Sequence, residues 1–113
     1  MLTIEILKQA GANTAKGMER CMNNEAFYLR LVNMALDDAS FGKLEQAVRG
    51  GDVKAGFEAA HALKGVLGNL ELSQIYEPVS ALTELLRSGE PADGTAYLEE
   101  ILKKRDELLA LRG

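Results

Sequence analysis

Residues 60 to 68 read Ala-His-Ala-Leu-Lys-Gly-Val-Leu-Gly and contain the only histidine of the 113-residue chain. On a helix, where each residue turns by about 100°, His61, Gly65 and Gly68 fall on one ridge and Lys64 lies beside them. Each glycine inside a helix costs about 1 kcal/mol relative to alanine. Two glycines next to the imidazole therefore indicate that a group from outside must reach the ring.

These four residues suit phosphate chemistry. His61 lies at the margin of the helix's apolar stripe, so one ring nitrogen can face solvent. Lys64 follows three residues later and can bring its ammonium near the ring, where it would serve phosphate as a compact point charge. Together they predict a site that carries a phosphoryl group on His61 and presents it, with Gly65 and Gly68 giving access. Taken singly, each has a plainer interpretation: a core-edge histidine, a solvated lysine, and glycines that permit close helix packing.

Length and composition set the broad class. A chain of 113 residues, 47% hydrophobic and 27% charged, is sufficient for a single domain with one core. The net charge of −4 argues against nucleic acid as a partner, because phosphate binding needs a basic surface. The sequence shows neither a membrane span nor a secretion signal, and the single Cys21 suits a reducing compartment, so we expect a cytoplasmic protein. One histidine and one cysteine cannot form a structural zinc site, so we expect no metal.

The rest of the sequence predicts helices separated by short breaks, over about residues 3–10, 13–22, 25–37, 40–50, 52–70, 73–88 and from 93 onward. Each begins at a residue that can cap a helix or open one: Thr3, Asn13, Asn24, Ser40, Asp52, Ser73 and Asp93. Pro78 lies about a turn inside its helix, where it would delay the start or bend the helix. Short connections make successive helices antiparallel, so we expect an all-α fold, an up-and-down antiparallel four-helix bundle with additional short N-terminal helices.

The segment around His61 is similar to a known motif. Histidine-containing phosphotransfer (Hpt) domains carry the signature A-H-x-L-K-G on the second long helix of a four-helix bundle, and residues 60–65 resemble it. Further similarities are Gly68, Asn69-Leu70, Leu85-Leu86-Arg87-Ser88-Gly89, Phe27-Tyr28-Leu29-Arg30-Leu31 and Gly50-Gly51-Asp52. The resemblance covers residues 24 to 111 of a single domain spanning 1–113. Residues 1 to 22 would be extra N-terminal helices that cover one end.

The resemblance implies a role for each matching residue. His61 would accept and donate the phosphoryl group, Lys64 would stabilise its charge, and Gly65 would let a partner approach. The partners would be a response-regulator receiver domain, a histidine kinase, or both. Mg²⁺ would be held by the receiver and no cofactor by this chain. We therefore expect a cytoplasmic, monomeric phosphocarrier of two-component signal transduction, not an autonomous kinase or phosphatase.

Two residues depart from the family's pattern. The family usually has glycine where Glu71 stands, and a negative charge there could disfavour an acidic partner rim. The neighbouring helix commonly offers a long polar side chain to orient the histidine, whereas Thr83, at the position that corresponds, is short. Both departures favour an alternative function, a non-phosphorylated helical adaptor that binds a receiver domain or kinase. The intact His61 and Lys64 argue against that alternative.

Two further alternatives remain open at the sequence level. The apolar stripe from Leu98 to Leu109 could form the seam of a dimer in a purely structural bundle. In addition, Met18, Cys21 and Met22 could supply an apolar docking patch beside the site, or could simply cover the end of the bundle.

Overall fold

Side-chain caps begin four of the seven helices in the computed structural model, which describes all 113 residues. Thr3, Asn13, Asn24 and Asp52 each accept a hydrogen bond of 3.0–3.2 Å from the backbone N–H three residues later, as their types predict. The helices are α1 (Ile4–Gln9), α2 (Thr14–Arg20), α3 (Glu25–Leu36), α4 (Ser40–Gly50), α5 (Val53–Asn69), α6 (Ser73–Leu86) and α7 (Thr95–Arg112). No strand is present, so the all-α prediction is confirmed.

The starts of α4 and α7 differ from the predicted caps. Ser40 is the first residue of α4 and does not cap it; instead, Asp38 Oδ1 accepts a hydrogen bond of 2.8 Å from the Ser40 N–H. Asp93 plays the same part before α7, where its Oδ1 accepts from the Thr95 N–H at 3.0 Å. Pro78 is buried inside α6 without delaying its start at Ser73. Pro78 is the sixth residue of α6 and has no N–H to donate to the Gln74 carbonyl, so the helix lacks that one backbone hydrogen bond.

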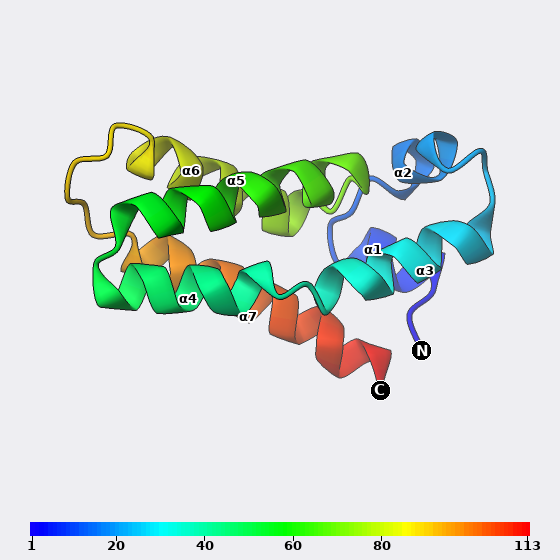
Figure 1. Ribbon diagram of the computed structural model, residues 1–113. Coiled ribbons are helices and arrows are strands. Elements are labelled where there is room, and N and C mark those ends of the chain that lie inside the picture. The colour runs from blue at the N-terminus through cyan, green and yellow to red at the C-terminus, as the bar shows by residue number, and fades with distance from the viewer.

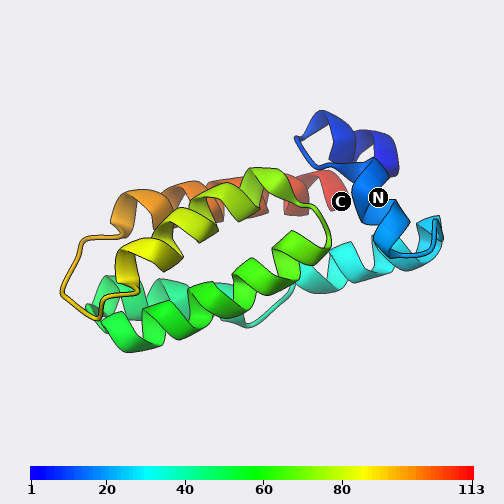
Figure 2. The same ribbon diagram turned by 90° about the horizontal axis from the view of Figure 1, so that it is seen from above.

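Helices α4 to α7 pack side by side as a bundle (Figure 1). Each contacts the next along the chain, and α4 also contacts α7, so the four close into a ring. Viewed from above, α3 continues beyond α4 toward the far end of the molecule (Figure 2). The molecule is elongated, 42 × 25 × 20 Å, as expected for parallel and antiparallel rods of this length.

The space between the helices is filled by one apolar core. Its largest fully buried side chains are Tyr28, Phe41, Leu7, Leu36, Leu44, Leu63, Leu67, Leu72, Ile75, Leu82, Leu98 and Ile101. Leu98, Ile101 and Leu108 of the α7 stripe are buried in the chain's own core, and Leu102 and Leu109 are partly buried against it. No helix is both long enough and apolar enough to cross a membrane.

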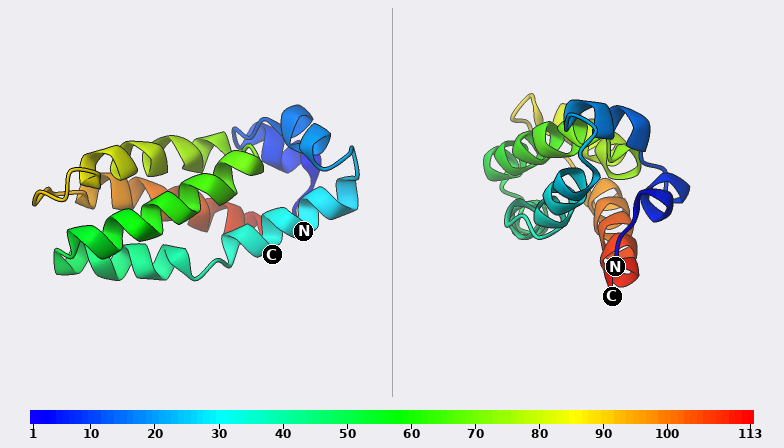
Figure 3. Two further views of the ribbon diagram at one scale, coloured as in Figure 1. Left: turned by 45° about the horizontal axis from the view of Figure 1, so that its top comes forward. Right: turned by 90° about the vertical axis from the view of Figure 1, so that its right-hand side faces the viewer.

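The N-terminal helices α1 and α2 cover the end of the molecule where α3 extends (Figure 3). The Tyr28 ring of α3 packs so closely against Gly17 of α2 that a Cβ there would lie 2.6 Å from it. The Tyr28 hydroxyl donates a hydrogen bond of 2.8 Å to the Leu70 carbonyl, at the turn between α5 and α6. Burial, with smaller contributions from Cys21 and Glu71, raises the pKa of Tyr28 to about 12. This one side chain therefore links α2, α3 and the end of α5.

The predicted patch of Met18, Cys21 and Met22 is not one surface. Cys21 is a buried free thiol, and Met18 is partly buried against the core. Met22 alone is exposed, at 91% of its full surface. Two of the three side chains therefore cover the end of the bundle, as the second of the two alternatives for these residues predicts.

Candidate functional site

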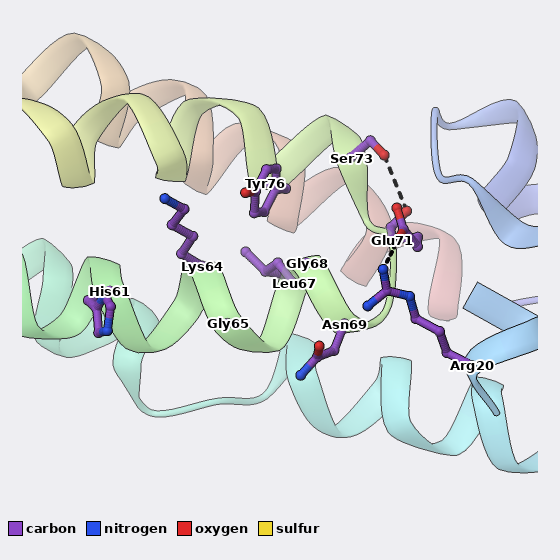
Figure 4. Close-up of a pocket in the computed structure, with 10 residues that line it drawn as sticks. All are labelled: Arg20, His61, Lys64, Gly65, Leu67, Gly68, Asn69, Glu71, Ser73 and Tyr76. Atoms are coloured by element: carbon purple, nitrogen blue, oxygen red, sulfur yellow. Dashed lines mark hydrogen bonds and ion pairs between the residues drawn. The ribbon is translucent and has the colours of Figure 1, made fainter. Parts of the chain in front are cut away.

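Helix α5 carries all four predicted site residues along one side. His61 and Gly65 are exposed, and Lys64 and Gly68 are partly buried. Figure 4 shows them following one another along the helix, with the Lys64 side chain reaching toward α6. They share an open groove of about 540 Å³ that runs toward α2. The groove is lined by Arg20, His61, Lys64, Gly65, Leu67, Gly68, Asn69, Glu71, Ser73 and Tyr76.

The two glycines of the ridge have different surroundings. A Cβ built on Gly65 would meet nothing within 4 Å, so the missing side chain leaves open space beside His61. A Cβ on Gly68 would lie 3.2 and 3.5 Å from two ring carbons of Tyr76 on α6. Gly68 therefore makes room for a side chain of its own protein. This contact matches the plainer interpretation of Gly68, close helix packing, whereas Gly65 has open space.

The imidazole of His61 rests against another aromatic ring. Its centroid lies 5.7 Å from that of Phe57, one turn earlier on α5, with 23° between the ring planes. No protein group hydrogen-bonds to either ring nitrogen. Phe57 was not singled out from the sequence as a site residue, although its spacing of four from His61 places both on one face of the helix.

Thr83 does not orient the histidine. Its side chain is fully buried, and its hydroxyl donates a hydrogen bond of 2.7 Å to the Val79 carbonyl within α6. Threonine hydroxyls commonly bond the carbonyl four residues earlier in a helix. The concern that this position lacks an orienting contact to His61 is therefore confirmed.

Two charged side chains at the C-terminal end of α6, Glu84 and Arg87, contact Lys64 and Phe57 of α5. Glu84 Oε1 is 3.9 Å from Lys64 Nζ, and both Glu84 oxygens accept hydrogen bonds of 3.0 Å from Arg87. The pKa of Glu84 is lowered, first by the hydrogen bond from Arg87 and also by the charges of Arg87 and Lys64. The Arg87 guanidinium in turn lies over the Phe57 ring, 5.3 Å from its centroid. The contacts of Lys64 with Glu84 and of Arg87 with Phe57 join two helices, so no spacing within one helix predicts them.

Glu71, which stands where the family usually has glycine, lies at the end of the groove away from His61. Its backbone has φ +57°, a left-handed conformation that glycine adopts without cost. This geometry explains why glycine is the usual residue at such a turn. The Glu71 carboxylate is 3.1 Å from the Arg20 guanidinium of α2, the ion pair drawn in Figure 4. Arg20 therefore offsets the negative charge that was expected to disfavour an acidic partner.

One comparison with known proteins decides the family. A model of the Hpt domain matches residues 30–112, from the middle of α3 to the end of α7. The chain belongs to the Hpt domain family. The match includes every predicted site residue and most of the bundle, and it leaves α1 and α2 outside. No curated protein and no solved structure matches the chain.

Membership of the Hpt family defines the general activity. Hpt domains are phosphotransfer modules of signalling systems, and they carry phosphoryl groups rather than catalyse reactions as enzymes. They act with receiver domains and kinases. In this structure no group of three or more His, Cys, Asp and Glu side chains is arranged to hold a metal ion.

Proposed function

We propose that this Hpt domain is a phosphorelay intermediate. His61 accepts a phosphoryl group from the phospho-aspartate of a receiver domain, or from a histidine kinase, and passes it to another receiver. The observation that carries the proposal is the exposed imidazole beside the open space at Gly65, on the same groove as the Lys64 ammonium. A partner's surface can approach the ring there without displacing any side chain.

The transfer to His61 requires no general base on this chain. The unprotonated nitrogen of the neutral His61 ring attacks the phosphorus of the acyl phosphate in line. A P–N bond forms, the P–O bond to the aspartate breaks, and the aspartate carboxylate leaves with the electron pair. The reverse steps on a second receiver return the ring to its starting state. Because the attacking nitrogen already has a free lone pair, no proton needs to be removed from it.

Charge neutralisation is shared between the two partners. The Lys64 ammonium is placed on the groove side of α5 and balances the charge of the phosphoryl oxygens once it turns from Glu84. The receiver domain supplies the Mg²⁺ that balances the rest of the charge. The chain itself uses no cofactor, binds neither nucleic acid nor membrane, and works as a cytoplasmic monomer.

Transfer between two receivers tests the proposal. Wild-type protein and His61→Gln are incubated with a panel of receiver domains labelled on aspartate with ³²P, and the label is followed to this chain and on to unlabelled receivers. The wild type is expected to become labelled by at least one receiver and to pass the label on, whereas His61→Gln takes none. Circular dichroism of both proteins shows that the helices are intact. Equal labelling of His61→Gln would overturn the assignment.

One observation favours a second candidate, a non-phosphorylated adaptor. Lys64 already faces a carboxylate, Glu84, and no protein group hydrogen-bonds to the His61 ring. An adaptor would bind a receiver through the same groove and take no label in the experiment above. Calorimetry would then give the same affinity of the adaptor for the phosphorylated and the unphosphorylated receiver.

A further inference from the structure

The side chain of His61 is exposed, and nothing hydrogen-bonds to its ring. Such a side chain is free to exchange between rotamers, each of which aims the ring nitrogens differently. In-line attack on phosphorus is sensitive to the placement of the nucleophile, and a small misplacement slows such reactions strongly. The orientation of the ring must therefore come from a contact other than a hydrogen bond.

The one ring that contacts the imidazole is Phe57. A centroid separation of 5.7 Å and an interplanar angle of 23° are in the range of favourable aromatic pairs. Phe57 is itself held, because it is partly buried and packs against the hydrophobic core. The Phe57 ring can therefore act as a fixed surface on which the imidazole stacks.

The Phe57 ring is also held by α6. The Arg87 guanidinium carbon lies 5.3 Å from the centroid of the ring, within the range of a cation–π contact. Arg87 has little freedom there, since its guanidinium donates two hydrogen bonds of 3.0 Å to Glu84. The same Glu84 is the carboxylate nearest to the Lys64 ammonium. Glu84 and Arg87 thus form one cluster at the C-terminal end of α6. Arg87 contacts Phe57, which stacks on His61, and Glu84 attracts Lys64.

Resting on the proposed function, we infer that Phe57 is the positioning residue for His61. The stack of Arg87, Phe57 and His61 limits the rotation of the imidazole and keeps one ring nitrogen directed to the open space beside Gly65. Phe57 acts only through the orientation of the His61 ring.

Labelling by a small donor tests this inference without any partner surface. Phe57→Leu keeps the apolar bulk and removes the ring, whereas Phe57→Tyr keeps the ring. With phosphoramidate as donor, Phe57→Leu is expected to label roughly two- to tenfold more slowly, the rate factor that corresponds to one aromatic pair. Phe57→Tyr is expected to label at the wild-type rate. Equal rates for Phe57→Leu and wild type, while His61→Gln takes no label, would overturn the inference and leave the proposed function standing. Labelling of His61→Gln would overturn the function itself.

Proton NMR supplies a readout that a merely structural role would not move. A ring stacked on an aromatic neighbour shows carbon-bound protons shifted upfield, so the His61 ring protons are expected to move downfield in Phe57→Leu and to stay in Phe57→Tyr. If Phe57→Leu fails to fold, the wild type decides the question through cross-peaks between the ring protons of Phe57 and His61. The absence of these cross-peaks in the folded protein would contradict the stack.

The chain offers a matched control for the arginine. Arg105 lies over the Phe41 ring at 4.9 Å from its centroid, the same type of contact on α7 and α4, outside the groove. Arg87→Met is expected to slow labelling by phosphoramidate, and Arg105→Met to leave the rate unchanged. An equal effect of Arg87→Met and Arg105→Met would show that Arg87 acts only on stability.

Discussion

The Lys64 ammonium lies 3.9 Å from the carboxylate of Glu84, close enough for attraction and too far for a hydrogen bond. Glu84 accepts two hydrogen bonds from Arg87 and none from Lys64, so it attracts the ammonium without a direct hydrogen bond. The lysine is therefore kept beside the groove and remains free to turn toward a phosphoryl group on His61. Glu84 competes with that phosphoryl group for the ammonium.

Substitutions at this pair are expected to have opposite effects. Lys64→Gln should slow labelling by phosphoramidate roughly tenfold, because it removes one charge-assisted contact to the phosphoryl group. Glu84→Gln should speed labelling by about two- to fivefold, the factor that a surface ion pair is worth. Initial rates from intact mass spectrometry measure both. If Glu84→Gln labelled more slowly than wild type, Glu84 would be a support of the site and not a competitor.

Gly65→Arg should separate chemistry from docking. A Cβ at this position meets nothing within 4 Å, so the variant should fold, yet a long cation there should obstruct a partner's surface. We expect nearly normal labelling by phosphoramidate and transfer from a receiver reduced by at least tenfold. Gly42→Arg is the matched control, because Gly42 is also helical and has open space around it. Unchanged receiver transfer in Gly65→Arg would refute the role of this space in access.

Alanine at the two glycines of the ridge should affect stability differently. Gly65→Ala is expected to raise the free energy of unfolding by about 1 kcal/mol, since alanine favours the helix and has room. Gly68→Ala should gain less or lose stability, because Tyr76 must move away from the new methyl group. Urea unfolding of both variants, of Tyr76→Ala and of Gly68→Ala combined with Tyr76→Ala measures the coupling between Gly68 and Tyr76. Equal gains at both glycines would contradict the packing of Tyr76 against Gly68.

Tyr28 should make the stability of the protein depend on alkaline pH. Its pKa is raised to about 12 in the folded protein, whereas the unfolded chain ionises near its ordinary value of 10. The folded state therefore binds the proton more tightly, and its advantage is fully present below pH 10. From pH 10 to 12 the stability should fall by about 1 kcal/mol per pH unit.

Tyr28→Phe is the control for this pH dependence. At pH 7 it should be about 1 kcal/mol less stable than wild type, since the Leu70 carbonyl loses its hydrogen bond. The difference between the two proteins should shrink to about zero near pH 11 and reverse its sign by pH 12, because the phenylalanine cannot ionise. A difference that stays constant or widens in urea unfolding across that range would contradict the buried neutral phenol.

The helices could be predicted because their signals are local. Thr3, Asn13, Asn24 and Asp52 cap helices through groups three residues away, and the caps are visible in the sequence. Ser40 was wrongly predicted to cap α4, because the Asp38 carboxylate, two residues earlier, is the better acceptor. Such an error arises because neighbouring polar residues compete to accept hydrogen bonds at the start of a helix.

The site could be predicted only as far as one helix defines it. The spacing of His61, Lys64 and Gly65 on α5 is a property of the sequence, and the structure places them on one side of the helix as expected. The role of Gly68 depends on the Tyr76 ring of α6, which no spacing within α5 shows. The contact of Arg87 with Phe57 likewise requires the packing of α6 on α5.

The most direct test of the account is the position of the phosphoryl group. Wild-type protein and His61→Gln are treated with phosphoramidate and followed by ³¹P NMR and by mass spectrometry of peptides at neutral or alkaline pH. The account predicts a single acid-labile, alkali-stable phosphoryl group on the peptide that contains His61, and none in His61→Gln. A phosphoryl group on another residue, or one retained in His61→Gln, would contradict it.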